Sequence, residues 1–98
     1  MKIPKKITVG NKTYAVIKVK HARTKNTLAT IDYTHGIIWM ATHDMQDNKL
    51  CKEEMADTFW HEITHAVLHD MNDALCNDEN FVTAFSHRLS LAIGSAKL

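Results

Sequence analysis

The spacing of hydrophobic residues changes once along this chain, near residue 50. Before that point apolar and β-branched residues occur in short runs separated by polar turns, a pattern typical of strands. Residues 7–19 predict two strands joined by a turn near Gly10, and residues 28–41 predict a second hairpin that turns at Gly36. The polar stretches between and after these hairpins predict loops at 21–27 and 42–48.

After residue 50 the apolar residues recur at helical spacing. Glu53 and Glu54 place negative charge in the first turn of a predicted helix, where the helix dipole favours it. The apolar stripe of this helix consists of Met55, Phe59, Ile63, Ala66 and Val67. The stretch 72–77 breaks the pattern, and Asn77 or Asp78 caps a final helix. The stripe of the final helix consists of Val82, Phe85, Leu89, Ala92, Ile93 and Ala96.

Four strands followed by two helices predict an α+β fold in a single domain that spans residues 1–98. We expect a small antiparallel sheet, made of the two hairpins in residues 1–48, to pack on the two helices in residues 49–98. Phe81 and Leu91 lie opposite the stripe of the final helix, where they cover another part of the domain or contact a second copy. The sequence leaves the oligomeric state open.

Composition and charge narrow the class of protein. Hydrophobic residues make up 45% of the chain and charged residues 23%, as in soluble globular proteins, and no apolar run is long enough to span a membrane. The net charge of +1 argues against a nucleic-acid binder, but residues 1–25 carry eight basic residues and no acid and leave this partner open. The polar N-terminus and the presence of only two cysteines, Cys51 and Cys76, indicate a cytoplasmic protein.

The segment FWHEITHAVLHD, residues 59–70, holds three of the seven histidines at intervals of four residues. In a helix, His61 and His65 lie about 40° apart on one face and about 6 Å apart along the axis, so both imidazoles can bind one metal ion. They lie off the apolar stripe, and Glu62 lies between the stripe and the histidines. The pattern His-Glu-x-x-His predicts a zinc site in which Glu62 is the general base of a peptidase.

The chemistry of such a site needs these residue types. Zinc lowers the pKa of a water molecule that it holds and polarises the carbonyl of a peptide bond, and a nearby carboxylate accepts the proton of the water. Two histidines require a third protein ligand. His69 lies about 12 Å along the helix axis from His61, so one straight helix does not bring it to the same ion.

Glu79, at the start of the final helix, is the favoured third ligand, because packing of that helix on the motif helix carries its carboxylate toward the histidines. The alternatives are His69, Asp78, His43 and His87. We expect His69 to lie at the rim of the site, where it contacts a substrate or a metal ligand. His43 precedes the motif helix and is a further candidate for contact with a substrate.

The stretches HEITHAVLH and ENFVTAF resemble the ImmA/IrrE group of small zinc metallopeptidases, which phages and mobile elements often carry. The resemblance covers roughly residues 30–95. It implies a minimal zincin fold in which His61, His65 and Glu79 bind Zn²⁺ and Glu62 is the catalytic base. It also suggests that a phage encodes the protein.

The leading hypothesis is a zinc-dependent peptidase that acts on a protein or peptide substrate. An extended substrate would add as a strand to an edge of the sheet beside the motif helix. The first alternative is a non-catalytic zinc-binding module that binds a phage or host regulator. The second is a metal-dependent hydrolase of another class, such as a nuclease, which only the basic first quarter of the chain supports.

Overall fold

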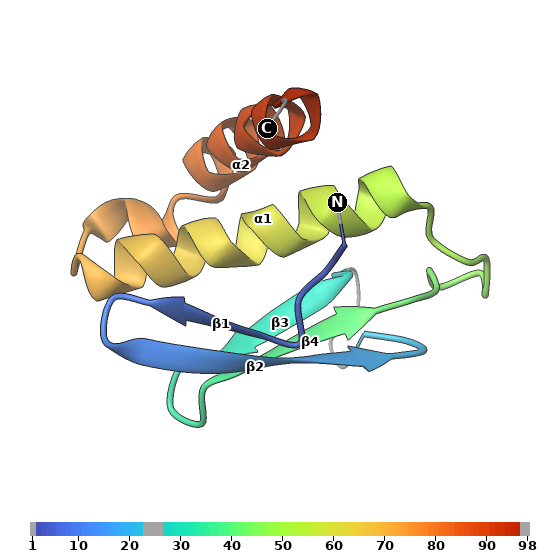
Figure 1. The fold of residues 1–98 in the computed structure, drawn as a ribbon, viewed down its shortest axis with the longest axis horizontal. Helices are drawn as coiled ribbons and strands as arrows, with labels where there is room; N and C mark the ends of the chain where they lie inside the picture. The colour runs from blue at the N-terminus through green and yellow to red at the C-terminus, as the bar shows by residue number, and fades with distance from the viewer. Residues whose placement is uncertain (1, 23–26, 97–98) are drawn as a thin grey trace.

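A computed structural model describes residues 2–22 and 27–96, which form a four-stranded sheet, two α-helices and a short 3₁₀ helix (Figure 1). The strands are β1 (Lys6–Val9), β2 (Lys12–Val19), β3 (Ala29–Asp32) and β4 (Ile37–Ala41). The helices are α1 (Lys52–Asp70), the 3₁₀ helix η1 (Ala74–Asn77) and α2 (Glu79–Ser95). This order confirms the α+β class. Within the described residues, no helix has the length and apolar character that a membrane span requires.

Both predicted hairpins are present. β1 pairs antiparallel with β2, and β3 pairs antiparallel with β4. Gly10 and Gly36 take positive φ angles of 59° and 65° in the two turns. At Gly36 a side chain would also come within 2.8 Å of the carbonyl oxygen of Thr13, so both the backbone conformation and the packing favour glycine there.

The expectation of a wholly antiparallel sheet is wrong at one pair of strands. β2 and β4 are parallel, and the strand order is β1-β2-β4-β3. The apolar sequence of β4, IIWMA, favours a central position, where Ile38 and Met40 are fully buried. β3 ends in Asp32, a residue more compatible with the edge of a sheet. After β2 the chain therefore forms the edge strand β3 first and then returns to form β4 between β2 and β3.

The hydrophobic core lies between the sheet and α1. The helix α1 crosses one face of the sheet, and α2 lies on the outer side of α1 (Figure 1). Phe59 and Ile63 of α1 belong to the same buried cluster as Tyr14 and Ile38 of the sheet. Among the described residues α2 contacts α1 and η1 but no strand, so α2 forms a third layer.

The buried face of α2 differs from its predicted apolar stripe. Val82 and Ser86 are buried, whereas Phe85 is 49% exposed. The other predicted members of the stripe are half-buried or exposed: Leu89, Ala92, Ile93 and Ala96. Because the main element that packs on α2 is the single helix α1, only a narrow strip of α2 is covered. Val67 of α1 was also expected in a buried stripe but is 41% exposed.

The predicted break between the two helices contains η1, which reverses the chain so that α2 begins beside α1. The side chain of Asp73 accepts a hydrogen bond from the backbone N–H of Leu75 at the start of η1. The side chain of Asp78 accepts one from the backbone N–H of Phe81 at 3.0 Å. Asp78, and not the alternative Asn77, is therefore the cap of α2, and Glu79 is the first residue of this helix.

Candidate metal centre

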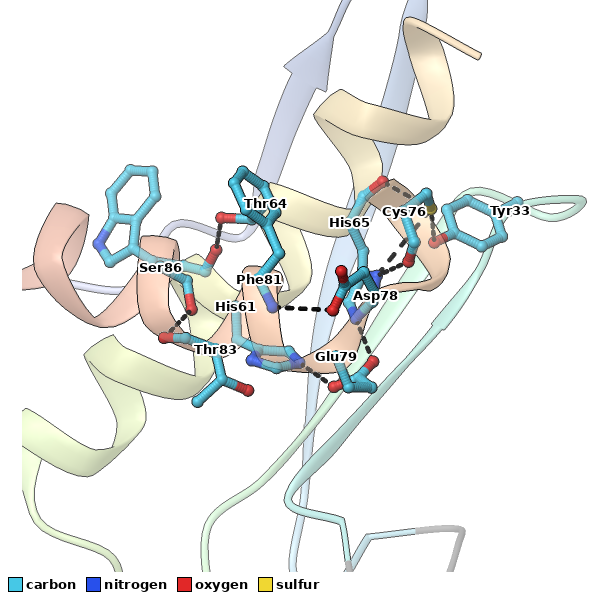
Figure 2. A network of polar contacts seen from close by, with 11 residues as sticks. Tyr33, His61, Thr64, His65, Cys76, Asp78, Glu79, Phe81, Thr83 and Ser86 are labelled. Atoms are coloured by element: carbon cyan, nitrogen blue, oxygen red, sulfur yellow. Dashed lines mark hydrogen bonds and ion pairs between the residues drawn. The ribbon is translucent and has the colours of Figure 1, made fainter. Parts of the chain in front are cut away.

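His61, His65 and Glu79 come together where α2 begins beside α1 (Figure 2). One carboxylate oxygen of Glu79 lies 3.1 Å from Nε2 of His61, and the other lies 2.8 Å from Nε2 of His65. One potential ligand atom from each of the three residues lies within 4.8 Å of the other two, so the group could hold a metal ion. Of the candidate third ligands, Glu79 is the one that the structure places at the two histidines.

A backbone contact fixes the orientation of His65. Its Nδ1 lies 2.8 Å from the carbonyl oxygen of Cys76, in η1. A carbonyl oxygen only accepts hydrogen bonds, so Nδ1 carries the proton and donates it. In the neutral imidazole, Nε2, which faces Glu79, is then the nitrogen whose lone pair can bind a metal ion.

His61 is also suited to bind a metal as the neutral imidazole. Burial lowers the pKa of His61, although the negative charge of Glu79 acts in the opposite direction. The side chains of His61 and His65 are 24% and 11% exposed. Because a metal ion competes with protons for imidazole nitrogens, a lowered pKa favours metal binding near neutral pH.

Glu62 is buried next to this group, with 7% of its surface exposed, and it lines the same cavity. Burial raises the pKa of Glu62 to about 7, with His65 opposing the shift and Glu79 adding to it. A carboxyl group with a pKa near neutrality can both accept and release a proton at physiological pH. The structure therefore gives Glu62 the surroundings of an acid–base group, beside the three candidate ligands.

The three candidate ligands line a cavity of about 550 Å³ between the two helices and β3. One wall comes from residues 27–33, which include β3, and the other carries the two histidines and Glu62. Three carboxylates, those of Asp57, Glu62 and Glu79, line the cavity, and no lysine or arginine of the described chain does. The cavity therefore favours cations and neutral groups over anions.

The donor set itself is suited to a metal ion. Imidazole nitrogens and a carboxylate oxygen are ligands that transition metals accept. Three protein ligands are fewer than the four that closed structural sites use, so coordination positions remain for solvent or substrate.

Other histidines proposed from the sequence lie elsewhere. His69 stacks on Tyr33 with ring centroids 3.9 Å apart, and Tyr33 lines the cavity, so His69 supports the cavity wall. Nδ1 of His43 lies 2.8 Å from Oγ1 of Thr42, and this histidine is not among the described residues that line the cavity. Nδ1 of His87 lies 2.9 Å from a carboxylate oxygen of Asp57.

Sequence patterns did not predict that Tyr33 and Cys76 belong to the site. Both residues line the cavity, and the hydroxyl of Tyr33 lies 3.5 Å from the sulfur of Cys76 (Figure 2). Burial raises the pKa of Tyr33 above its usual range, so the hydroxyl keeps its proton. Cys76 orients His65 through a carbonyl oxygen, which every residue type possesses, so no side-chain pattern identifies this role.

No protein-family model, curated protein or solved structure matches this chain. The resemblance to the ImmA/IrrE group thus rests on the quoted residues alone. The function has to be argued from the geometry of the site.

Proposed function

We propose that this protein is a zinc-dependent peptidase. The observation that carries the proposal is the convergence of His61, His65 and Glu79 on a cavity in which Glu62 is buried with a raised pKa. Two histidines and one glutamate form a donor set that catalytic zinc sites use. The proposal keeps the activity and the ligands that the resemblance to the ImmA/IrrE group implies.

The residues of the chain divide the chemistry between them. Zn²⁺ held by His61, His65 and Glu79 would polarise a peptide carbonyl and lower the pKa of a water molecule. Glu62 accepts a proton from the attacking water and delivers it to the leaving amine. Burial raises the pKa of Glu62 in the metal-free chain, and the positive charge of a bound Zn²⁺ would lower this pKa again and favour the ionised carboxylate that accepts the proton of water.

The substrate we propose is an extended segment of a protein. β3 is an edge strand of the sheet, and its residues Ala29 and Ile31 line the cavity. An extended peptide can add to a free edge through main-chain hydrogen bonds, which are independent of its sequence. Binding along β3 would bring a peptide bond to the metal group and Glu62.

Two features argue against the alternative functions. A nuclease binds an anionic phosphodiester, whereas three carboxylates and, among the described residues, no lysine or arginine line this cavity. A non-catalytic zinc module would be expected to have a closed set of four protein ligands, whereas three side chains gather here next to a cavity of about 550 Å³.

The substitution Glu62→Gln tests the proposal, because the amide is nearly isosteric and cannot accept the proton of water. We expect wild type and Glu62→Gln to contain one zinc per chain by elemental analysis after purification without added metal. Each protein is added to a bacterial lysate, and mass spectrometry detects the new N-termini that cleavage produces. We expect new N-termini only with the wild type. Asp70→Asn makes the same change from carboxylate to amide at an exposed position of α1 outside the cavity and should cleave like the wild type.

Two results would contradict the proposal. The first is wild-type protein that contains no transition metal and gains no stability when zinc is added. The second is cleavage of the same bonds by Glu62→Gln at the wild-type rate, which would remove Glu62 from the mechanism.

A further inference from the structure

A second cavity, of about 650 Å³, lies between the N-terminal half of α1 and the C-terminal half of α2, and we refer to it as the interhelical groove. Its apolar surface comes from Ala56 and Trp60 of α1 and from Leu91 and Ile93 of α2. Leu91 is 61% exposed, so it does not cover another part of the domain, and its contact with a second copy stays a prediction. The groove therefore presents apolar surface that α1 and α2 do not bury against each other.

The charges of the groove are mainly negative. Glu53, Glu54 and Asp57 line it along α1, and Lys52 is the one cation of the described lysines and arginines that does so. One oxygen of Glu54 accepts a hydrogen bond from the backbone N–H of Cys51 at 3.2 Å, which fixes this carboxylate at the start of the helix. Apolar surface bordered by carboxylates is complementary to a segment that carries both apolar and basic side chains.

The groove and the candidate metal centre share one lining residue, Asp57. Asp57 lines both cavities, and it lies four residues before His61, one helical turn away on the same face of α1. Nδ1 of His87 lies 2.9 Å from the carboxylate of Asp57 and holds it between the two helices. Asp57 is therefore the point at which a peptide bound in the metal cavity would reach the groove.

We propose that the interhelical groove binds a basic and apolar segment of the protein substrate, adjacent to the segment that is cleaved. This inference rests on the proposed peptidase function, because the bound segment is part of a substrate only if the protein is a peptidase. Basic side chains of the segment pair with Glu53 and Asp57, and an apolar side chain packs between Trp60 and Leu91. Main-chain pairing along β3 does not discriminate between substrate sequences. Binding in the groove therefore makes cleavage selective for proteins that carry such a segment.

Fluorescence anisotropy of a labelled peptide measures binding to the groove directly. The probe is a short peptide made only of lysine, leucine and alanine, and its control has glutamate at each lysine position. The host protein is the zinc-loaded Glu62→Gln variant, so that no cleavage interferes. We expect the basic peptide to bind about tenfold more tightly than the acidic one, and we expect this difference to shrink as salt is raised.

Two variants of α2 form a matched pair. Leu91→Lys places a positive charge and removes apolar surface inside the groove, whereas Phe85→Lys makes a similar change at an exposed apolar residue that does not line it. We expect Leu91→Lys to weaken binding of the basic peptide about tenfold. Phe85→Lys should bind the basic peptide as the host does. Leu91→Met, which keeps an apolar side chain in the groove, should also bind it as the host does.

Equal binding of the basic and acidic peptides, or equal losses in Leu91→Lys and Phe85→Lys, would overturn the inference. Amide shifts in an NMR titration should fall on groove residues such as Ala56, Ser90 and Gly94, and shifts confined to other surfaces would also overturn it. Glu79→Ala separates the two proposals. This variant lacks a metal ligand that is not part of the groove, so its binding of the basic peptide should persist even though cleavage is lost.

Discussion

The carboxylate of Glu79 is shared between the two histidines, with one oxygen toward each Nε2. The side chain of Glu79 is 66% exposed, so the protein does little to bury this group, and its position follows from being the first residue of α2. His65, in contrast, is enclosed and hydrogen-bonded to a backbone carbonyl. The site thus combines fixed histidines with a carboxylate that is held mainly by the start of its helix.

Two substitutions test whether Glu79 or His69 is the third metal ligand. We expect Glu79→Ala to lower zinc affinity by about two orders of magnitude or more, because it removes one of three protein ligands. His69→Ala should change the affinity only a few-fold, since His69 stacks on Tyr33 and is not part of the ligand group. Competition with a fluorescent zinc chelator measures both affinities. The reverse order of effects would show that His69 is the ligand.

The raised pKa of Glu62 predicts a pH dependence of stability in the metal-free protein. The folded chain holds the proton up to about pH 7, whereas the carboxyl group ordinarily loses it near 4.5. Folding therefore becomes less favourable as pH rises through this window, by a few kcal/mol at about 1.4 kcal/mol per pKa unit. His61 acts in the opposite direction, because burial lowers its pKa and protonation at low pH destabilises the fold.

Comparison with Glu62→Gln isolates the contribution of the carboxyl group. Urea unfolding in the presence of a chelator gives the free energy of unfolding at pH 5 and pH 8. We expect the wild type to lose stability relative to Glu62→Gln between these two values. An identical pH profile for the two proteins would mean that Glu62 titrates normally in the fold.

At the scale of the secondary structure elements, the start of α2 connects helix capping with the candidate site. The side chain of Asp78 caps the helix through the N–H of Phe81, and the next residue in the chain is Glu79. Loss of the cap frays the first turn, and that turn carries the exposed candidate ligand Glu79. The capping residue, which is not part of the candidate ligand group, therefore controls the position of Glu79.

We expect Asp78→Ala to lower the free energy of unfolding by about 1 kcal/mol and to weaken zinc binding as well. Asn77→Ala is the matched control, because Asn77 is the neighbouring residue and does not cap the helix. Thermal unfolding and zinc competition measure the two effects. A loss of stability without any loss of zinc affinity would show that Glu79 is positioned independently of the cap.

The order of elements and the two hairpins were predictable, because strand and helix periodicities depend on neighbours along the chain. The His-Glu-x-x-His spacing located two candidate ligands and Glu62 for the same reason. The parallel pairing of β2 with β4 was not predictable from hairpin signals, since it depends on which strand takes the centre of the sheet. The contact of His65 with the carbonyl of Cys76 leaves no mark on side-chain patterns.

For the whole molecule, the metal should contribute to stability. With 98 residues the chain builds one modest core between the sheet and α1, and α2 adds little to it. We expect a chelator to lower the Tm of the zinc-loaded protein by about 10 °C or more, because ligand binding stabilises the folded state and 1 kcal/mol corresponds to about 4–8 °C in a small domain. Calorimetry with Glu79→Ala as control measures this shift. An unchanged Tm would contradict it.

The third-layer position of α2 has a consequence for local unfolding. α2 can separate from α1 without disturbing any strand of the described sheet, so its opening free energy is lower than that of the whole domain. Metal bound by two residues of α1 and one of α2 would raise the cost of that opening selectively. Amide protons of α2 would then exchange with solvent in a zinc-dependent manner, while those of β4 report only global unfolding. Loss of the metal would release the outer helix first and expose the apolar sides of both helices.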